Sequence, residues 1–102
     1  MAAVVYEVLN PQGEADQPSV RGIRPRLARL DDMRIGLFIN FKDVAPIIQG
    51  FVEREFRSRF PNVKITTYRY LINNAVQDNP DEWPRFRQWV QGCDAVVGAV
   101  GD

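Results

Sequence analysis

The side chains of this chain that could do chemistry stand directly after two apolar runs. Asn40, Lys42 and Asp43 follow "RIGLFI", and Gly101 and Asp102 follow "DAVVGAV". An amide can donate to or accept from a substrate, a lysine can hold an anion, and an aspartate can cap a helix. If the two runs are neighbouring parallel strands, both loops open on one crevice, where open parallel sheets bind ligands. The sequence therefore predicts a substrate or anion site formed by Asn40, Lys42, Asp43, Gly101 and Asp102.

A plainer interpretation of the first loop stays open. Asn40 and Asp43 can serve only to shape a turn, with the Lys42 ammonium group in solvent. Even then, the backbone amides around residues 43–45 would face the crevice at the start of a helix, where N–H groups attract carboxylate or phosphate.

The composition excludes several classes of site. The 102 residues include no histidine and one cysteine, so the usual metal ligand, the usual neutral-pH base and a CxxC pair are all missing. Charges balance at 13 against 13, which gives no global attraction to nucleic acid or acidic lipid. We expect one cytoplasmic α/β domain with no metal and no cofactor. The sequence shows neither a membrane span nor a signal peptide.

The glycines and the cysteine near the end of the chain carry weak signals. Neither G-x-G-x-x-G nor G-x-x-x-x-G-K-[ST] is present. We interpret Gly98 as close packing inside a strand and Gly101 as a flexible point before a turn. Cys93 precedes the last strand, at the edge opposite the expected site, and is expected to be a buried, inert thiol rather than a nucleophile.

Residues 1–33 differ in character from the rest and are predicted to form an arm. Val4 to Leu9 ("VVYEVL") predicts a short strand, and "NPQGE" a turn after it. The following stretch is irregular, and Leu27 and Leu30 are expected to anchor it. Its four arginines have no interleaved aromatic residues, which favours a solvated arm or a clasp onto acidic partner residues over an RNA site; they are Arg21, Arg24, Arg26 and Arg29.

Residues 34–102 predict a β-α-β-α-β half-domain. The strands are expected over 34–40, 63–70 and 94–100. The first helix is expected to be capped by Asp43 and stopped by Pro61, and the second to be capped by Asn79 and stopped by Gly92. In the first helix, apolar side chains recur at helical spacing opposite an outward charged face. They are Val44, Ile47, Ile48, Phe51, Val52, Phe56 and Phe60. In the second helix, Trp83, Phe86, Trp89 and Val90 form a stripe expected in the core, or partly in an interface.

This order predicts a three-stranded parallel sheet, order 2-1-3, with helices on both faces, which is half of a doubly wound Rossmann-like fold. Complete versions carry five or six strands. The last strand would therefore keep an open apolar edge, which is a liability for a soluble protein. We expect that strand to pair with a second chain or with a missing carboxyl-terminal half.

Three segments resemble the amino-terminal half of the UGSC-motif (seleno)protein family. They are "VLNPQGE", "RPRLARLDDMRIGLFINFKDVA" and "CDAVVGAVGD", in that order and over nearly the whole chain. In that family a "CDAVVxxxGD" strand runs directly into selenocysteine or cysteine, followed by Gly-Ser-Cys. The resemblance therefore implies a reactive residue immediately after Asp102, with Gly101 and Asp102 as its approach and Asn40 and Lys42 in the loop beside it.

The family resemblance implies redox chemistry on a small-molecule substrate at a selenolate or thiolate, with the second cysteine able to resolve the adduct. A more distant similarity to selenoprotein B of the glycine reductase type suggests reductive cleavage. We expect the chain to end at a UGA codon or at a subunit boundary, and to be inactive alone. Two other functions stay open: a non-catalytic interaction subunit, and a module that binds small anions or nucleotides.

Overall fold

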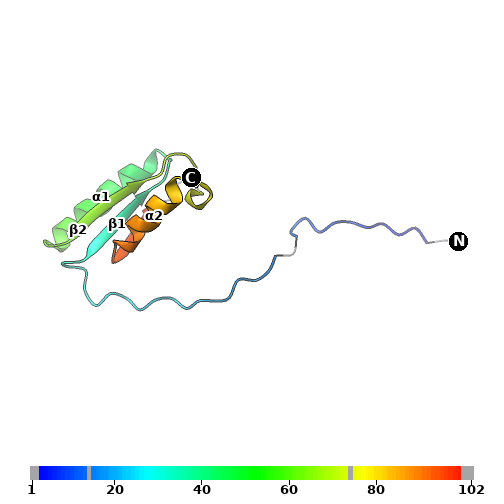
Figure 1. The fold of residues 1–102 in the computed structure, drawn as a ribbon, viewed down its shortest axis with the longest axis horizontal. Coiled ribbons are helices and arrows are strands. Elements are labelled where there is room, and N and C mark those ends of the chain that lie inside the picture. The colour runs from blue at the N-terminus through cyan, green and yellow to red at the C-terminus, as the bar shows by residue number, and fades with distance from the viewer. Residues whose placement is uncertain (1–2, 14, 74, 100–102) are drawn as a thin grey trace.

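The computed structural model describes residues 3–13, 15–73 and 75–99 (Figure 1). Its elements are β1 (Arg34–Ile39), α1 (Val44–Arg59), β2 (Lys64–Arg69), a 3-10 turn (Val76–Asp78), α2 (Glu82–Gln91) and β3 (Ala95–Ala99). The predicted β-α-β-α-β order is confirmed, and the observed ends lie within one or two residues of the expected ones. The predicted site residues Gly101 and Asp102 lie outside the described residues.

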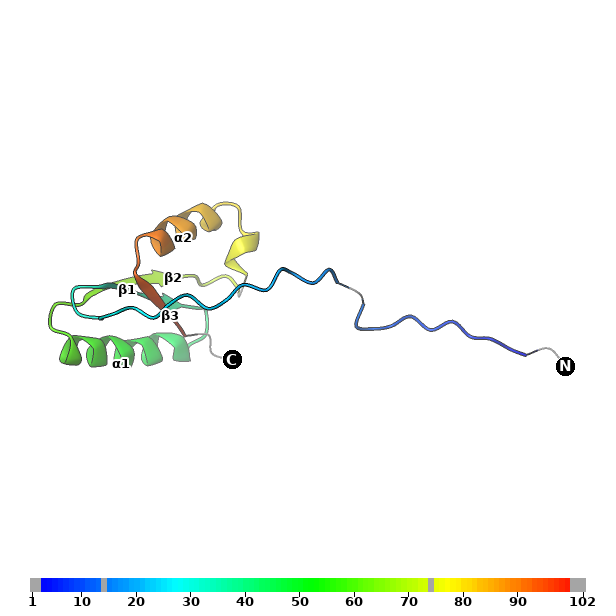
Figure 2. The same cartoon turned by 90° about the horizontal axis from the view of Figure 1, so that it is seen from below.

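The three strands form one parallel sheet in the order β2-β1-β3, as predicted. β1 is central because both of its faces are apolar: Ile35 and Leu37 are at most 2% exposed on one face, and Gly36 is buried on the other. Helix α1 covers one face of the sheet and α2 covers the opposite face (Figure 2). The molecule therefore has the layers of half a doubly wound fold.

Helix α1 packs on the sheet through a narrower stripe than the sequence predicts. Ala45 and Gln49 are its buried residues, and Val52 and Phe56 pack against the core cluster of Ile35, Leu37 and Val63. The predicted inward positions Val44, Ile47, Ile48 and Phe51 are instead 40 to 63% exposed. The sheet is only three strands wide, so no described element covers this part of the helix.

In the described residues, no helix has the length and apolarity needed to cross a bilayer.

The Gln49 amide joins α1 to the two strands beneath it. Its Nε2 atom donates to the carbonyl oxygens of Phe38 in β1 and Val97 in β3, both at 2.8 Å. Because this side chain is only 2% exposed, the two hydrogen bonds are made in an environment with little competing water. They fix the depth at which the helix sits over the β1–β3 pair.

Helix α2 packs through an aromatic layer on the other face. Phe86 and Trp89 contact Tyr68 of β2 with ring centroids 5.5 and 5.3 Å apart, and Phe86 lies 5.5 Å from Phe38 of β1. The Trp89 indole N–H donates to the Thr66 hydroxyl at 3.1 Å. In the predicted stripe, Trp83, Phe86 and Trp89 are half-buried in this layer, whereas Val90 is 36% exposed.

The glycine that allows close packing is Gly36 and not Gly98. A Cβ at Gly36 would lie 2.7 Å from both the Cys93 sulfur and an atom of the Trp89 ring. A Cβ at Gly98 would meet nothing within 4 Å, which corrects the prediction of close packing there. The difference arises because α2 crosses over β1 and β2 and leaves this position of β3 open.

The first part of the chain is an extended arm, which gives the molecule extents of 81 × 32 × 26 Å (Figure 1). No strand is assigned to Val4–Leu9, where the sequence predicts one, because that segment has no neighbouring strand. The arm is anchored at its end by Leu30, which packs against the core cluster, whereas Leu27 is 39% exposed. The Asp31 carboxylate adds a bond there by accepting from the backbone N–H of Asn62 at 2.8 Å.

Candidate functional site

The carboxyl ends of all three strands meet at one edge of the sheet. Ile39, the last residue of β1, is opposite Arg69 of β2 and Ala99 of β3, which are the last residues of their own strands. The loop after β1 therefore leaves the sheet beside the last residue of β3. We name this edge, with the loop of residues 40–43 beside it, the carboxyl edge.

Asn40 is buried at the carboxyl edge, where it is 1% exposed. Its Oδ1 atom accepts a hydrogen bond from the backbone N–H of Lys42 at 3.2 Å, so the side chain shapes the turn that leads to α1. Next to it, the Tyr70 N–H donates to the Ile39 carbonyl at 3.0 Å and extends the β1–β2 pairing by one step. The turn is therefore held by the amide that the sequence proposed as a substrate contact.

Lys42 and Asp43 follow Asn40 and are less buried. The Lys42 ammonium nitrogen lies 4.8 Å from the centre of the Phe41 ring, a cation–π contact that holds the charge near the edge. Asp43 is exposed and immediately precedes α1, but its side chain makes no capping hydrogen bond. Its φ and ψ of −64° and −28° are already helical, whereas a capping residue is extended. Asp43 thus holds the predicted cap position, but the capping hydrogen bond expected from its side chain is absent.

The sequence did not indicate two further residues of the carboxyl edge, Arg69 at the end of β2 and Tyr70 directly after it. Arg69 is exposed and lies opposite Ile39, so it adds a second cation to this edge. Tyr70 is 2% exposed, and its hydroxyl has no hydrogen-bond partner among the described residues. Their position at the end of "VKITTYRY" was the available signal, because β2 and β1 are parallel neighbours.

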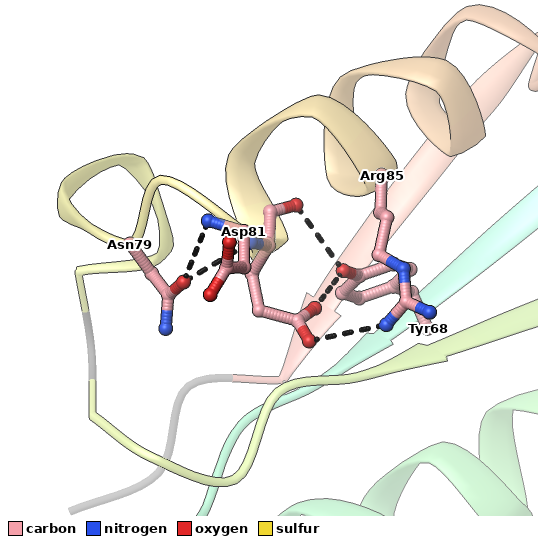
Figure 3. Close-up of polar contacts among 5 residues, drawn as sticks. Tyr68, Asn79, Asp81 and Arg85 are labelled. Atoms are coloured by element: carbon pink, nitrogen blue, oxygen red, sulfur yellow. Dashed lines mark hydrogen bonds and ion pairs between the residues drawn. The ribbon is translucent and has the colours of Figure 1, made fainter.

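A polar cluster joins β2 to the start of α2 (Figure 3). The Tyr68 hydroxyl donates to the Glu82 carboxylate, which also pairs with Arg85 at 3.5 Å. Burial, followed by the nearby Glu82 carboxylate, raises the pKa of Tyr68 to about 12. Tyr68 therefore stays protonated at neutral pH, and the cluster holds α2 in place without offering a base.

Asn79 caps α2, as predicted (Figure 3). Its side-chain oxygen accepts from the backbone N–H groups of Asp81 and Glu82 at 3.0 and 3.1 Å, and its carbonyl accepts from Trp83 at 2.9 Å. These bonds satisfy N–H groups that have no partner inside the helix. The helix start beside the Tyr68 cluster is therefore fixed by local sequence.

Cys93 lies at the opposite, amino edge of the sheet. Its sulfur contacts the Trp89 carbonyl at 3.3 Å. Burial raises the pKa of the Cys93 thiol, with opposing effects of Arg34, which lowers it, and Asp94, which raises it. A thiol with a raised pKa is a poor nucleophile at neutral pH, and this one is remote from the carboxyl edge.

A comparison with protein families now adds to this geometry. The model of the UGSC family matches residues 7–102. The chain belongs to the UGSC family. Comparisons with curated proteins and with solved structures found no match. The match includes all three strands and the loop of residues 40–43. The carboxyl edge therefore lies within the family domain of this UGSC chain.

The carboxyl edge of the UGSC chain is electropositive on the α1 side. Lys42 and Arg69 supply two cations against the carboxylate of Asp43, and the 16-residue helix α1 begins there with its positive end. Such an arrangement can attract a carboxylate or phosphate and can lower the pKa of a thiol or selenol placed nearby. A pocket of about 330 Å³ lined by Leu30 and the carboxyl-terminal part of α1 lies at the other end of that helix and is mainly apolar. In the described part of the chain, no three His, Cys, Asp or Glu side chains gather to hold a metal.

Proposed function

We propose that this chain is the amino-terminal part of a selenocysteine- or cysteine-dependent redox enzyme. The reactive residue would follow Asp102 directly and work at the carboxyl edge on a small-molecule substrate. The register of Ile39 opposite Ala99 supports the proposal, since the described part of β3 ends beside the start of the loop of Asn40 and Lys42. Membership of the UGSC family supports the nature of the reactive residue.

The described residues would prepare the edge for a chalcogen nucleophile. Lys42, Arg69 and the start of α1 favour the anion, because a positive charge nearby stabilises a thiolate or selenolate over its protonated form. The same charges would orient an anionic substrate. Asn40 keeps the turn in shape through its bond to the Lys42 N–H. The chain's own Cys93 does not suit this role, because burial raises the pKa of its thiol.

Two chalcogen atoms would together supply the two electrons of the redox step. The selenolate or thiolate attacks an atom of the substrate, forms a covalent bond to it and expels the leaving group with the electron pair of the broken bond. The thiolate of the second cysteine of the Sec/Cys-Gly-Ser-Cys segment then attacks the selenium or sulfur of this adduct. The remaining part of the substrate leaves with the electron pair of its bond to that atom and takes up a proton, and a selenylsulfide or disulfide remains. An external thiol reductant must restore the resting state.

The test starts from the DNA after the codon of Asp102. We expect UGA or a cysteine codon there, and a thiol-alkylating reagent should modify that residue in the full gene product. In a Cys93→Ser background, the reactive group should show a pKa below the roughly 8.5 of an ordinary thiol. Lys42→Ala and Arg69→Ala should each raise that pKa and slow alkylation at pH 7.

Lys64→Ala is the matched control, because Lys64 is an exposed lysine at the amino edge of the same sheet. It should leave the alkylation profile unchanged. A downstream codon for any other amino acid would end the proposal. So would a residue after Asp102 that reacts no faster than Cys93.

A further inference from the structure

Two groups of exposed apolar side chains lack a neighbouring element in the described part of the chain. The first is the arm segment Val4–Leu9, whose five apolar side chains are 73 to 92% exposed. The second, which we name the open flank, is formed by Val44, Ile48 and Phe51 of α1, at 40 to 63% exposure. Burying apolar surface of this kind stabilises a fold by roughly 25 cal/mol per Å², so both groups gain from a partner.

The open flank lies on the side of α1 that faces the outer edge of β3. A helix turns about 100° per residue, so residues on either side of the buried Ala45–Gln49 stripe face opposite directions. On one side, Pro46, Gly50 and Glu53 line a pocket together with Thr67 of β2. The open flank is on the other side of the stripe, away from β2 and next to β3.

The outer edge of β3 has no strand beside it among the described residues. β3 pairs with β1 on one side and ends the sheet on the other. Alternate N–H and C=O groups of its five residues therefore point away from the sheet, where they form a template for another strand. Val96, 40% exposed on the α2 face, adds apolar surface to this edge.

We propose that the arm segment Val4–Leu9 of the same chain, in place of the second chain or carboxyl-terminal half expected from the sequence, adds to this edge as a fourth strand and covers the open flank. Its residue types are those of a strand, and side chains in a strand alternate between two faces. Val4, Tyr6 and Val8 form an entirely apolar face, which fits against the open flank. The other face carries the single charge, Glu7, and belongs on the Val96 side, which α2 leaves open to water.

The length of the connection allows the new strand to run parallel to β3. An antiparallel hairpin is joined by about 2 to 5 residues, whereas a parallel crossover needs about a dozen or more. Residues 10–33 remain between the arm segment and β1, enough to return along a strand about 20 Å long. The turn in which the Gly13 N–H donates to the Asn10 carbonyl at 3.2 Å would then lie at the carboxyl edge.

Hydrogen exchange of the 102-residue chain tests this pairing amide by amide. We expect slow exchange at the β3 amides that do not bond to β1. A Val5→Pro/Val8→Pro variant should speed them by about tenfold or more, because neighbouring strand positions alternate in direction and one of the two prolines must remove a donor that faces β3. The matched control is Val20→Pro/Ile23→Pro, with the same spacing in an equally exposed part of the arm, and it should change nothing.

The same measurement can overturn the proposal. Fast exchange at all outward β3 amides in the unmodified chain would do so, as would equal exchange rates in the two double variants. Protection that grows with protein concentration, together with a dimer in sedimentation, would assign the edge to a second copy instead. None of these readouts involves a reactive thiol, so this inference can fail while the proposed redox function stands, and the reverse.

Discussion

At the scale of single residues, the contact that sets the distance between α2 and the sheet is at Gly36. Gly36 lies in the central strand, under the Trp89 ring and the Cys93 sulfur. A Cβ atom at this position would lie 2.7 Å from that sulfur and from an atom of that ring. The sulfur is additionally held by the Trp89 carbonyl. Neither neighbour can move away freely, because Trp89 is tied to Thr66 by its indole N–H. The missing side chain at Gly36 is therefore a requirement of this packing.

Gly36→Ala should lower the free energy of unfolding by about 1 to 3 kcal/mol, as expected for overpacking a closely packed layer. Gly98→Ala is the control, because the two glycines lie on neighbouring strands and a Cβ at Gly98 meets nothing within 4 Å. Its effect should stay within about 0.5 kcal/mol. Urea unfolding followed by tryptophan fluorescence measures both. Equal midpoints for the two variants would contradict this account of the α2 layer.

At the scale of elements, the two helices begin in different ways. Helix α2 is capped by the Asn79 side chain, which accepts from two backbone N–H groups. Helix α1 follows Asp43, whose side chain makes no such bond. Only α2 therefore draws stability from a side-chain cap, and its position over β2 depends on it.

Asn79→Ala should destabilise the chain by about 1 kcal/mol, the usual cost of losing a capping side chain. Asp43→Ala should cost less, since no capping bond is lost. Thermal unfolding followed by far-ultraviolet circular dichroism compares the two variants under the same conditions. An Asp43→Ala variant that unfolds earlier than Asn79→Ala would contradict the assignment of caps.

The elements could be predicted from the sequence where a local pattern decides them. "RIGLFI" is apolar on both faces, which placed β1 at the centre, and Asn79 with Pro80 marked the start of α2. Local pattern could not choose the buried face of α1, because Val44–Ile48–Phe51 and Ala45–Gln49–Val52 both recur at helical spacing. Only the neighbouring strands choose between them. The close packing at Gly36 likewise depends on which helix crosses it.

The candidate site could be predicted in part for the same reason. Asn40 and Lys42 follow an unmistakable strand, and the parallel order brings that loop to the end of β3. Arg69 and Tyr70 were missed because their own strand was interpreted alone. Their place at the edge follows from the register of β2 on β1, which the sequence does not display.

At the scale of the whole molecule, the described residues combine a sheet whose β3 edge is unpaired with a strand-like segment outside the sheet. The arm extends the radius of gyration to 20.6 Å, whereas a compact chain of this length has about 13 Å. The gain from joining the two parts is apolar area on the open flank and backbone bonds along β3. The cost is the ordering of a short segment, about 1 to 2 kcal/mol per residue for the backbone. The radius of gyration in solution shows whether the gain or the cost in free energy is larger.

Small-angle X-ray scattering of the 102-residue chain should therefore give a radius of gyration well below 20.6 Å, near the roughly 13 Å of a compact chain. The Val5→Pro/Val8→Pro variant should be more extended, because its arm segment cannot bond to β3, and Val20→Pro/Ile23→Pro should match the unmodified chain. Each value should be independent of concentration, since the pairing is within one molecule. If both double variants scatter like the unmodified chain, a compact shape must come from general collapse of the arm, and the fourth strand is not needed to explain it.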